Sequence, residues 1–345
     1  MSARHRSPRR IYVTDCEGPL SRNDNAQELA AHFIPDGAEF FARLSRYDDF
    51  LADVERRPGY NAGDTLRLLA PFLVAFGASD DAVVRFSADN VLLVPRARQL
   101  LHALPRLLHT FIISTSYTPY IRALCQVTGF DIAHCRSTVL SLDAWRLDHD
   151  EAARLRERAA LIVRRPLIAI PHGAASVADL SAQDRETVAE FDRLFWDELA
   201  GTVGGELVAA VRPIGGGMKL AALEEIVAAV GCAGQDVMYV GDSITDAPAL
   251  AAVRQWGGAA LSFNGNGYAL GAAEFAVAAA DASPAYTLAR AFAQGGTIGV
   301  RTQARTWPAK AGGLVGILNE NREVLTAASL AARASVRGER LARLG

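Results

Sequence analysis

Short apolar runs alternate with longer segments of helical periodicity along most of the chain. Four of the runs end in polar residues and have the length of buried strands: 11–14, 111–114, 237–240 and 259–263. Runs of this length, rich in valine, isoleucine and aromatic residues, are typical of parallel strands covered by helices on both faces. The pattern therefore predicts an α/β fold whose core is a doubly wound, Rossmann-like parallel sheet.

The interval between the first two predicted strands has a helical pattern. Apolar residues recur at helical spacing over 40–54 and again over 66–76, where Gly77 follows as a helix terminator. An apolar stripe of this kind is ordinarily core packing. We interpret residues 21–94 as a helical cap inserted after the turn at Pro19.

A second long interval, 131–211, carries both kinds of pattern. Its apolar runs predict strands over 138–142, 167–170 and 207–211, and its periodicity predicts helices over 150–163 and 181–200. We interpret this interval as a second insertion, of α+β type.

After about residue 283 the chain becomes rich in alanine and arginine. Gly312 and Gly313 mark a break, and residues 322–344 are expected to form a terminal helix, so we assign 291–345 to a C-terminal helical extension. The remaining segments form the predicted core: 1–20, 95–130 and 212–290.

Composition narrows the classes of protein. Half of the 345 residues are hydrophobic and 21% are charged, which is typical of a folded chain with a large core. The balance of 36 basic against 38 acidic residues argues against a nucleic-acid-binding protein, which normally has a basic excess. No apolar run is long enough to cross a membrane or to act as a secretory signal. The four cysteines show no Cys-x-x-Cys spacing, so we expect free thiols and a cytoplasmic location.

Two acidic residues follow the first predicted strand. Asp15 and Glu17 lie one residue apart and precede Gly18 and Pro19, which turn the chain. Ligands of open α/β sheets bind at the carboxyl ends of the strands, so this position suits a functional pair of carboxylates. The alternative is an ordinary structural turn with acidic residues.

Two more acids follow the strand at 237–240. Asp242 and Asp246 lie four residues apart at a strand-to-helix junction, and carboxylates at such a place suit Mg²⁺. The alternative is that one of them only caps the next helix, which Pro248 helps to begin.

Hydroxyls and a lysine complete the pattern. The second strand ends in Ser114 and Thr115, whose hydroxyls suit a phosphoryl oxygen but are also common in turns. Lys219 opens a helix after three glycines, and it is one of only two lysines among the 36 basic residues, the other being Lys310. A compact ammonium at a helix start suits phosphate neutralisation. The segment is not a P-loop, because its glycine spacing differs.

The order of these features along the chain resembles the haloacid dehalogenase superfamily. An Asp-x-acid pair follows the first strand, Ser and Thr follow the second, and a lysine precedes Gly-Asp-x-x-x-Asp after a further strand. The pattern is most similar to the Mg²⁺-dependent phosphatases of that superfamily, and the Asp-x-Glu-Gly-Pro form is similar to an archaeal-type branch. The resemblance covers core elements over 10–20, 95–130 and 212–285 and does not identify the insertions.

The resemblance implies a role for each of these residues. Asp15 would be the phosphoryl-accepting nucleophile, Glu17 the acid and base, and Lys219 the charge stabiliser. Ser114 would donate a hydrogen bond to the phosphoryl group, with Thr115 as the alternative.

The resemblance also implies a Mg²⁺ cofactor. Asp15, Glu17, Asp242 and Asp246 would hold it. Family phosphatases usually have aspartate at the position of Glu17; glutamate keeps the proton-transfer chemistry but is one methylene longer. Dehalogenases lack the full acidic set, which favours phosphate chemistry here.

The expected function is hydrolysis of a phosphate monoester through an aspartyl-phosphate. The expected substrate is a small phosphorylated metabolite, with neither nucleic acid nor membrane as partner. The alternatives are a phosphotransferase or phosphomutase on the same fold, and a binding protein that has the fold without turnover. The sequence leaves the substrate's identity and the oligomeric state open.

Overall fold

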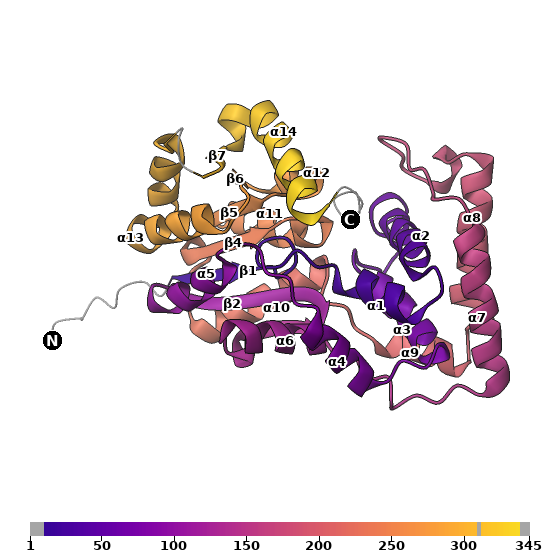
Figure 1. The fold of residues 1–345 in the computed structure, drawn as a ribbon. Helices are drawn as coiled ribbons and strands as arrows, with labels where there is room; N and C mark the ends of the chain where they lie inside the picture. The colour runs from indigo at the N-terminus through magenta and orange to yellow at the C-terminus, as the bar shows by residue number, and fades with distance from the viewer. Residues whose placement is uncertain (1–9, 309–311, 339–345) are drawn as a thin grey trace.

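The core of the protein is a seven-stranded sheet. The computed structural model describes residues 10–308 and 312–338. The strand order is β3-β2-β1-β4-β5-β6-β7, and only β7 runs antiparallel to its neighbour within the described residues (Figure 1). This confirms the predicted Rossmann-like fold. The strands are β1 (Ile11–Thr14), β2 (His109–Tyr117), β3 (Cys135–Thr138), β4 (Val237–Gly241), β5 (Ala259–Phe263), β6 (Phe275–Ala278) and β7 (Leu314–Ile317).

Helices cover both faces of the sheet. Side chains alternate along each strand, so Tyr12 packs in the cluster on one face while Ile11 and Val13 pack in the cluster on the other. One face is covered by α5 (Ala97–Ala103), α6 (Thr118–Thr128) and α13 (Ser283–Arg305). The other is covered by α10 (Gly217–Val230), α11 (Ala247–Gln255) and α12 (Gly267–Ala272).

The strand order reverses between β1 and β4. From β1 the chain continues to β2 and β3 on one side, and β4 pairs with the opposite side of β1. Thr14 is level with Val240 in this pairing. The segments after the two strands therefore leave the sheet next to each other, at the topological switch point where ligands of such sheets bind.

The interval after β1 is helical. The helices expected over 40–54 and 66–76 are present, with a π-helical turn closing the first. The elements are α1 (Asn25–Phe33), α2 (Gly37–Asp49), η1 (Phe50–Val54), α3 (Thr65–Ala75) and α4 (Asp80–Asp89), and η2 (Leu104–Arg106) follows α5.

The strands that we predicted inside the second insertion were wrong. Of residues 138–142, only Thr138 is in a strand, at the end of β3 in the core sheet; 167–170 has no regular element, and 207–210 lies in helix α9. Thr202 caps α9 by accepting a hydrogen bond from Gly205, and Leu207 packs in a helical core, which explains why an apolar run became a helix. The elements are η3 (Ile132–His134), α7 (His149–Arg164), η4 (Val177–Asp179), α8 (Ala182–Asp192), η5 (Arg193–Glu198) and α9 (Val203–Ala210).

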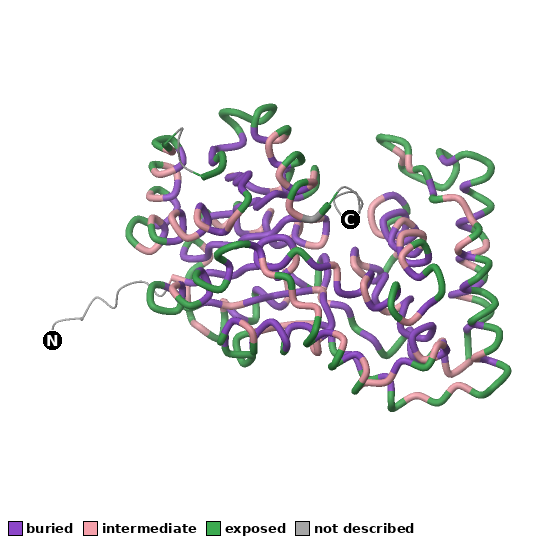
Figure 2. The backbone as a smooth tube through the Cα atoms, viewed as in Figure 1, coloured by how far each residue is buried: buried purple, intermediate pink, exposed green. Residues whose placement is uncertain are grey.

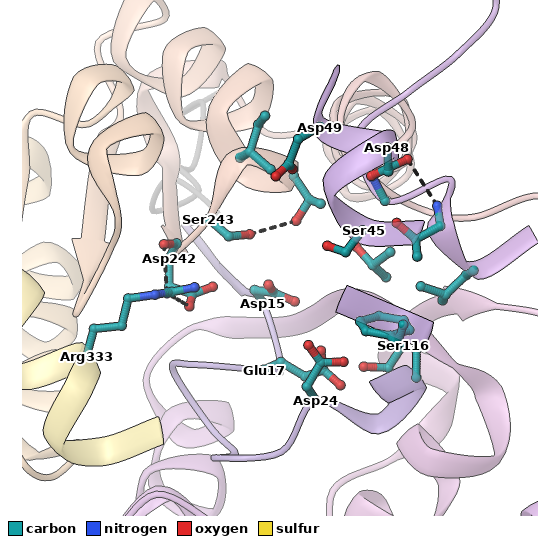
Figure 3. A pocket seen from close by; sticks show the side chains of 18 residues that line it. Asp15, Glu17, Asp24, Ser45, Asp48, Asp49, Ser116, Asp242, Ser243 and Arg333 are labelled. Atoms are coloured by element: carbon teal, nitrogen blue, oxygen red, sulfur yellow. Dashed lines mark hydrogen bonds and ion pairs between the residues drawn. The ribbon is translucent and has the colours of Figure 1, made fainter. Parts of the chain in front are cut away.

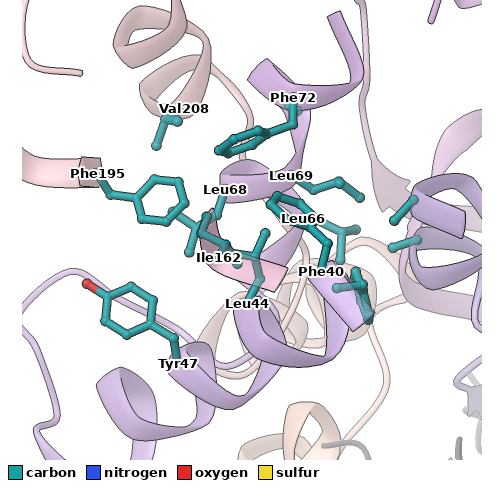
Figure 4. Packing of buried hydrophobic residues seen from close by; sticks show 14 of the residues in the cluster. Phe40, Leu44, Tyr47, Leu66, Leu68, Leu69, Phe72, Ile162, Phe195 and Val208 are labelled. Atoms are coloured by element: carbon teal, nitrogen blue, oxygen red, sulfur yellow. The ribbon is translucent and has the colours of Figure 1, made fainter. Parts of the chain in front are cut away.

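The two inserted segments share one hydrophobic core. Phe40 and Leu44 of α2 lie in the same buried cluster as Ile162 of α7 and Phe195 of η5 (Figure 4). Hydrogen bonds cross between the segments as well, from Tyr47 Oη to Asp192 Oδ1 at 2.5 Å and from Trp196 Nε1 to Tyr47 Oη at 2.9 Å. Helices α1, α2 and α3 of the first segment lie beside α7, α8 and α9 of the second at one end of the sheet, and exposed residues lie on their outer sides (Figure 2). Helix α4 instead packs against α6.

The C-terminal part of the chain adds to the core. After η6 (Gly234–Asp236), η7 (Ile244–Asp246) and α13, the strand β7 extends the sheet at its edge, and α14 (Leu318–Arg337) follows. This edge strand was not predicted from the sequence, and three of its four residues are buried. The predicted terminal helix is present up to Arg337, and its last residues, 339–344, lie outside the described residues. No helix in the described part of the chain is long and apolar enough to cross a membrane.

Candidate active site

A cavity of about 100 Å³ lies where the ends of β1, β2 and β4 meet the inserted helices. Core residues line one side and residues of α1, α2 and the start of α3 line the other (Figure 3). The lining residues are Asp15, Glu17, Asp24, Ala26, Phe41, Ser45, Asp48, Asp49, Gly63, Thr65, Leu66, Thr115, Ser116, Asp242, Ser243, Ile244, Thr245 and Arg333.

Asp15 is held rigidly at the end of β1. Its backbone N–H donates to Val240 O at 2.8 Å, and its Oδ1 accepts from the backbone N–H of Cys16 at 2.6 Å. The residue is 4% exposed. Cys16 points the other way into the core, where burial raises the pKa of its thiol well above the ordinary value. The structure thus presents Asp15 to the cavity and keeps its neighbour out of it.

The turn after β1 requires a glycine. Gly18 has a φ of +98°, and a Cβ at this position would collide with the carboxylate of Asp242. Gly241 at the end of β4 is equally constrained, because a Cβ there would collide with Asp246. Gly18 therefore lets the carboxylate of Asp242 approach the turn after β1, and Gly241 lets the carboxylate of Asp246 fold back onto the end of its own strand.

Lys219 joins two of the carboxylates. Its Nζ lies 2.8 Å from Asp15 Oδ2 and 2.7 Å from Asp246 Oδ1, and its side chain is fully buried. Burial alone would lower the pKa of Lys219, but the charges of Asp15 and Asp246 raise it above its usual value, so the ammonium is charged. Burial, followed by the charge of Asp246, raises the pKa of Asp15, and Lys219 opposes that effect.

The two acids after β4 have different surroundings. Asp246 Oδ1 accepts from Lys219 and from Tyr239 Oη at 2.9 Å, and its Oδ2 accepts from the backbone N–H groups of Asp242 and Ser243. Most of its acceptor capacity is therefore used by the protein. Asp242 instead faces the cavity, with Arg333 as its ion-pair partner.

Three of the predicted metal ligands form one cluster. Asp15, Asp242 and Asp246 are all buried, and one oxygen from each lies within 4.8 Å of the other two. Buried carboxylate oxygens grouped in this way fit a hard cation such as Mg²⁺. Glu17 lies outside that cluster but lines the same cavity.

Glu17 connects the turn after β1 to helix α1. Its Oε1 accepts a hydrogen bond of 2.8 Å from the backbone N–H of Asn25, the first residue of α1. A carboxylate at a helix start is favoured by the helix dipole, so α1 fixes the direction of this side chain.

The hydroxyls of β2 lie differently from the prediction. Ser114 is fully buried, accepts from the backbone N–H of Ser116 at 3.2 Å and does not line the cavity. Thr115 lines the cavity, and its hydroxyl donates to Ile214 O at 3.0 Å. Ser116 also lines the cavity, is 2% exposed, and its Oγ has no hydrogen-bond partner in the described structure. Ser116 could have been identified from the sequence, because it follows Ser114 by two residues and so lies on the same face of the strand.

Several other polar residues that line the cavity were not predicted from the sequence. Asp48 and Asp49 come from α2, and burial raises the pKa of Asp48 to about 8 and that of Asp49 to about 6. Both oxygens of Asp48 accept backbone N–H groups, from Gly63 at 2.8 Å and Thr65 at 3.0 Å, so this residue shapes the cavity wall. Arg333 comes from α14 and had no distinguishing signal, because arginine supplies all but two of the 36 basic residues.

Comparisons with known proteins identify solved structures of similar fold. No protein-family model and no curated protein matches the chain. A gene product of Archaeoglobus fulgidus has a solved structure that matches with a TM-score of 0.83 and 29% identity, over 97% of this chain and 99% of that one. The two chains therefore share the inserted segments as well as the core.

Phosphoserine phosphatases are also among the structural neighbours. A substrate-bound complex matches with a TM-score of 0.48 and 12% identity, over 82% of this chain and 99% of that chain. A phospho-aspartyl intermediate analogue matches with a TM-score of 0.46 and 12% identity, over 77% and 92%. At these TM-scores, nothing about the activity of the present chain follows from the likeness.

Proposed function

We propose that the protein is a Mg²⁺-dependent hydrolase of small phosphate monoesters that works through an aspartyl-phosphate on Asp15. The observation that carries the proposal is the contact of one buried lysine with Asp15 and Asp246 at the sheet's switch point. A cation there can stabilise a phosphoryl group on Asp15, because it is buried and fixed before the reaction begins.

In the first half of the reaction, an oxygen of the Asp15 carboxylate attacks phosphorus and the bond to the leaving oxygen breaks. Glu17 donates its proton to that leaving oxygen. Its position on the cavity wall, oriented by the N-terminus of α1, suits this transfer. Lys219 offsets the negative charge on the transferred group.

In the second half, Glu17 accepts a proton from water as the water oxygen attacks phosphorus. The bond between phosphorus and Asp15 breaks, and inorganic phosphate leaves. The resemblance implies Ser114 as the hydroxyl donor, with Thr115 as the alternative, and of these two only Thr115 lines the cavity. We add Ser116 because its buried Oγ faces the cavity and lacks another partner in the described structure.

Asp15, Asp242 and Asp246 fit a bound Mg²⁺, and Glu17 belongs to the set that the resemblance implies. When bound, the ion would neutralise charge on the phosphoryl oxygens. Asp242 is the ligand best suited to direct coordination, since Asp246 already accepts five protein hydrogen bonds, from Lys219, Tyr239, the backbone of Asp242, and the backbone and hydroxyl of Ser243.

We propose that residues 21–94 and 131–211 act together as one cap over the core formed by 1–20, 95–130 and 212–290. Their shared hydrophobic cluster supports this division. A cavity of about 100 Å³ beneath the cap suits a small metabolite better than a protein or a nucleic acid.

The proposed function is tested by incubating the protein with a panel of small phosphorylated metabolites and Mg²⁺ and measuring released phosphate. The panel should include alcohols, sugars and amino alcohols as leaving groups. Release of phosphate in the presence of an added sugar acceptor, without phosphorylation of that sugar, supports hydrolysis. Phosphorylation of the acceptor would instead identify a phosphotransferase.

Chelation is expected to abolish the activity. Lys219 and Arg333 supply two positive charges against the three carboxylates of Asp15, Asp242 and Asp246. Mg²⁺ should therefore reduce the repulsion that remains and raise the Tm by binding the native state. The measurement is phosphate release and Tm after exhaustive EDTA treatment and again after Mg²⁺ is restored. Full activity in the chelated protein would contradict the metal assignment.

A further inference from the structure

The C-terminal helix α14 delivers an arginine into the candidate active site. Leu325, Ser329 and Arg333 are spaced by four residues and are each at most 1% exposed, so they form one buried face of the helix. Ser329 Oγ donates to Gly265 O at 2.9 Å, which fixes the helix on the loop after β5. Figure 3 shows Arg333 reaching from this helix to Asp242.

Asp242 sets the position of the guanidinium. Arg333 Nη1 donates to Asp242 Oδ2, and it also lies 3.2 Å from the backbone oxygen of Asp242. A side chain this buried and doubly bonded loses little further freedom when it binds a ligand.

Acidic residues outnumber basic residues on the cavity wall. Six of the lining residues are carboxylic acids, and Arg333 is the one lysine or arginine among those that line the cavity in the described structure. Lys219 lies behind Asp15, fully buried, and is not part of the wall. A phosphate monoester is an anion, and Arg333 is the side-chain cation placed to contact it on the cavity wall, in addition to the Mg²⁺ proposed above.

We propose that Arg333 is a substrate-binding residue that contacts the phosphoryl oxygens of the ligand. The proposal rests on the proposed function for the identity of the ligand as a phosphate monoester. Guanidinium is the side-chain group best suited to this contact, because its planar set of donors matches two oxygens of a phosphate.

A purely structural role for Arg333 makes a different prediction. In that case it would only neutralise Asp242, since a buried carboxylate without a partner is costly. Removal of Arg333 would then lower stability and leave phosphate affinity unchanged. The affinity of the protein for an oxyanion therefore separates the two roles.

The experiment is a calorimetric titration of the whole protein with inorganic phosphate and with orthovanadate at saturating Mg²⁺. The variants are Arg333→Gln and Arg333→Lys, and the control is Arg322→Gln, an exposed arginine on the same helix. A separate titration with Mg²⁺ alone measures metal affinity, and circular dichroism checks the fold.

We expect Arg333→Gln to weaken binding of both anions by about 10- to 100-fold, the range for a hydrogen bond between charged groups. Arg333→Lys should lose less, Arg322→Gln should bind as the wild type does, and Arg333→Gln should not weaken Mg²⁺ binding. Wild-type anion affinity in Arg333→Gln would overturn the proposal. So would absence of anion binding in the wild type, or equal loss of Mg²⁺ and anion binding in both Arg333 variants.

Neither titration depends on turnover. Anion binding that requires Arg333, in a protein without phosphatase activity on any substrate, would leave this inference standing and refute the proposed function. If the protein hydrolyses phosphate monoesters but its Arg333→Gln variant binds phosphate as the wild type does, the proposed function stands and this inference is refuted.

Discussion

Replacement of Lys219 by methionine should lower kcat by about 10²- to 10³-fold, the usual effect of removing one fixed donor to a developing charge. Lys219→Arg should lose most of the activity too. A single ammonium nitrogen lies 2.8 Å from Asp15 and 2.7 Å from Asp246, and a planar guanidinium is too wide for that fully buried position. The measurement is steady-state phosphate release at saturating Mg²⁺.

The matched control for Lys219→Arg is Lys310→Arg, the same exchange at the only other lysine, which lies outside the described residues. It should have wild-type kcat. Loss of Lys219 leaves two buried carboxylates without their cation, so Tm should fall and Mg²⁺ should restore part of it. Equal activity of Lys219→Arg and Lys310→Arg would remove Lys219 from the mechanism.

Replacement of Glu17 by glutamine should lower turnover by about 10²- to 10⁴-fold, the range for general acid–base assistance. Glutamine keeps the shape of the side chain and can still accept from the Asn25 N–H, but it cannot exchange a proton. A substrate with a good leaving group needs little protonation, so only its second half-reaction should be slow.

The measurement is pre-steady-state release of a chromogenic leaving group by Glu17→Gln. We expect a burst close to one leaving group per protein, followed by slow turnover. Full steady-state turnover by this variant would show that Glu17 is not the acid and base. The proton transfer would then have to come from another residue of the cavity.

Features set by local sequence could be predicted. Asp15 and Asp242 each follow directly after a buried strand, and the parallel sheet brings strand ends to one edge, so their proximity follows from the fold class. Lys219 was detectable because lysine is rare in this chain. These predictions needed no knowledge of how the insertions fold.

Features set by long-range packing could not be predicted. Arg333 reaches Asp242 across 91 positions of sequence, and nothing in its neighbourhood distinguishes it from other arginines. The sequence pattern places Asp48 on the polar face of an amphipathic helix. In the structure this residue is only 4% exposed, because α3 packs beside it. Leu207 lies in a run that suits a strand as well as a helix, and packing in the buried cluster with α3 and α7 selects the helix.

The position of the hydroxyl donor illustrates a smaller limit. The apolar run ends at Ser114, but β2 continues to Tyr117, so the strand carries Ser116 rather than Ser114 to the cavity wall. Sequence patterns locate the last residues of a strand poorly, because the final pairing depends on the neighbouring strand.

The covalent intermediate is the most direct test of the account. Wild-type protein would be mixed with Mg²⁺ and a substrate found in the metabolite panel, quenched in acid within milliseconds, digested and analysed by mass spectrometry. The account predicts a phosphate on the peptide that contains Asp15, which accumulates in Glu17→Gln and is absent in Asp15→Asn. Turnover without any phosphate on that peptide, or a phosphate that persists in Asp15→Asn, would contradict it.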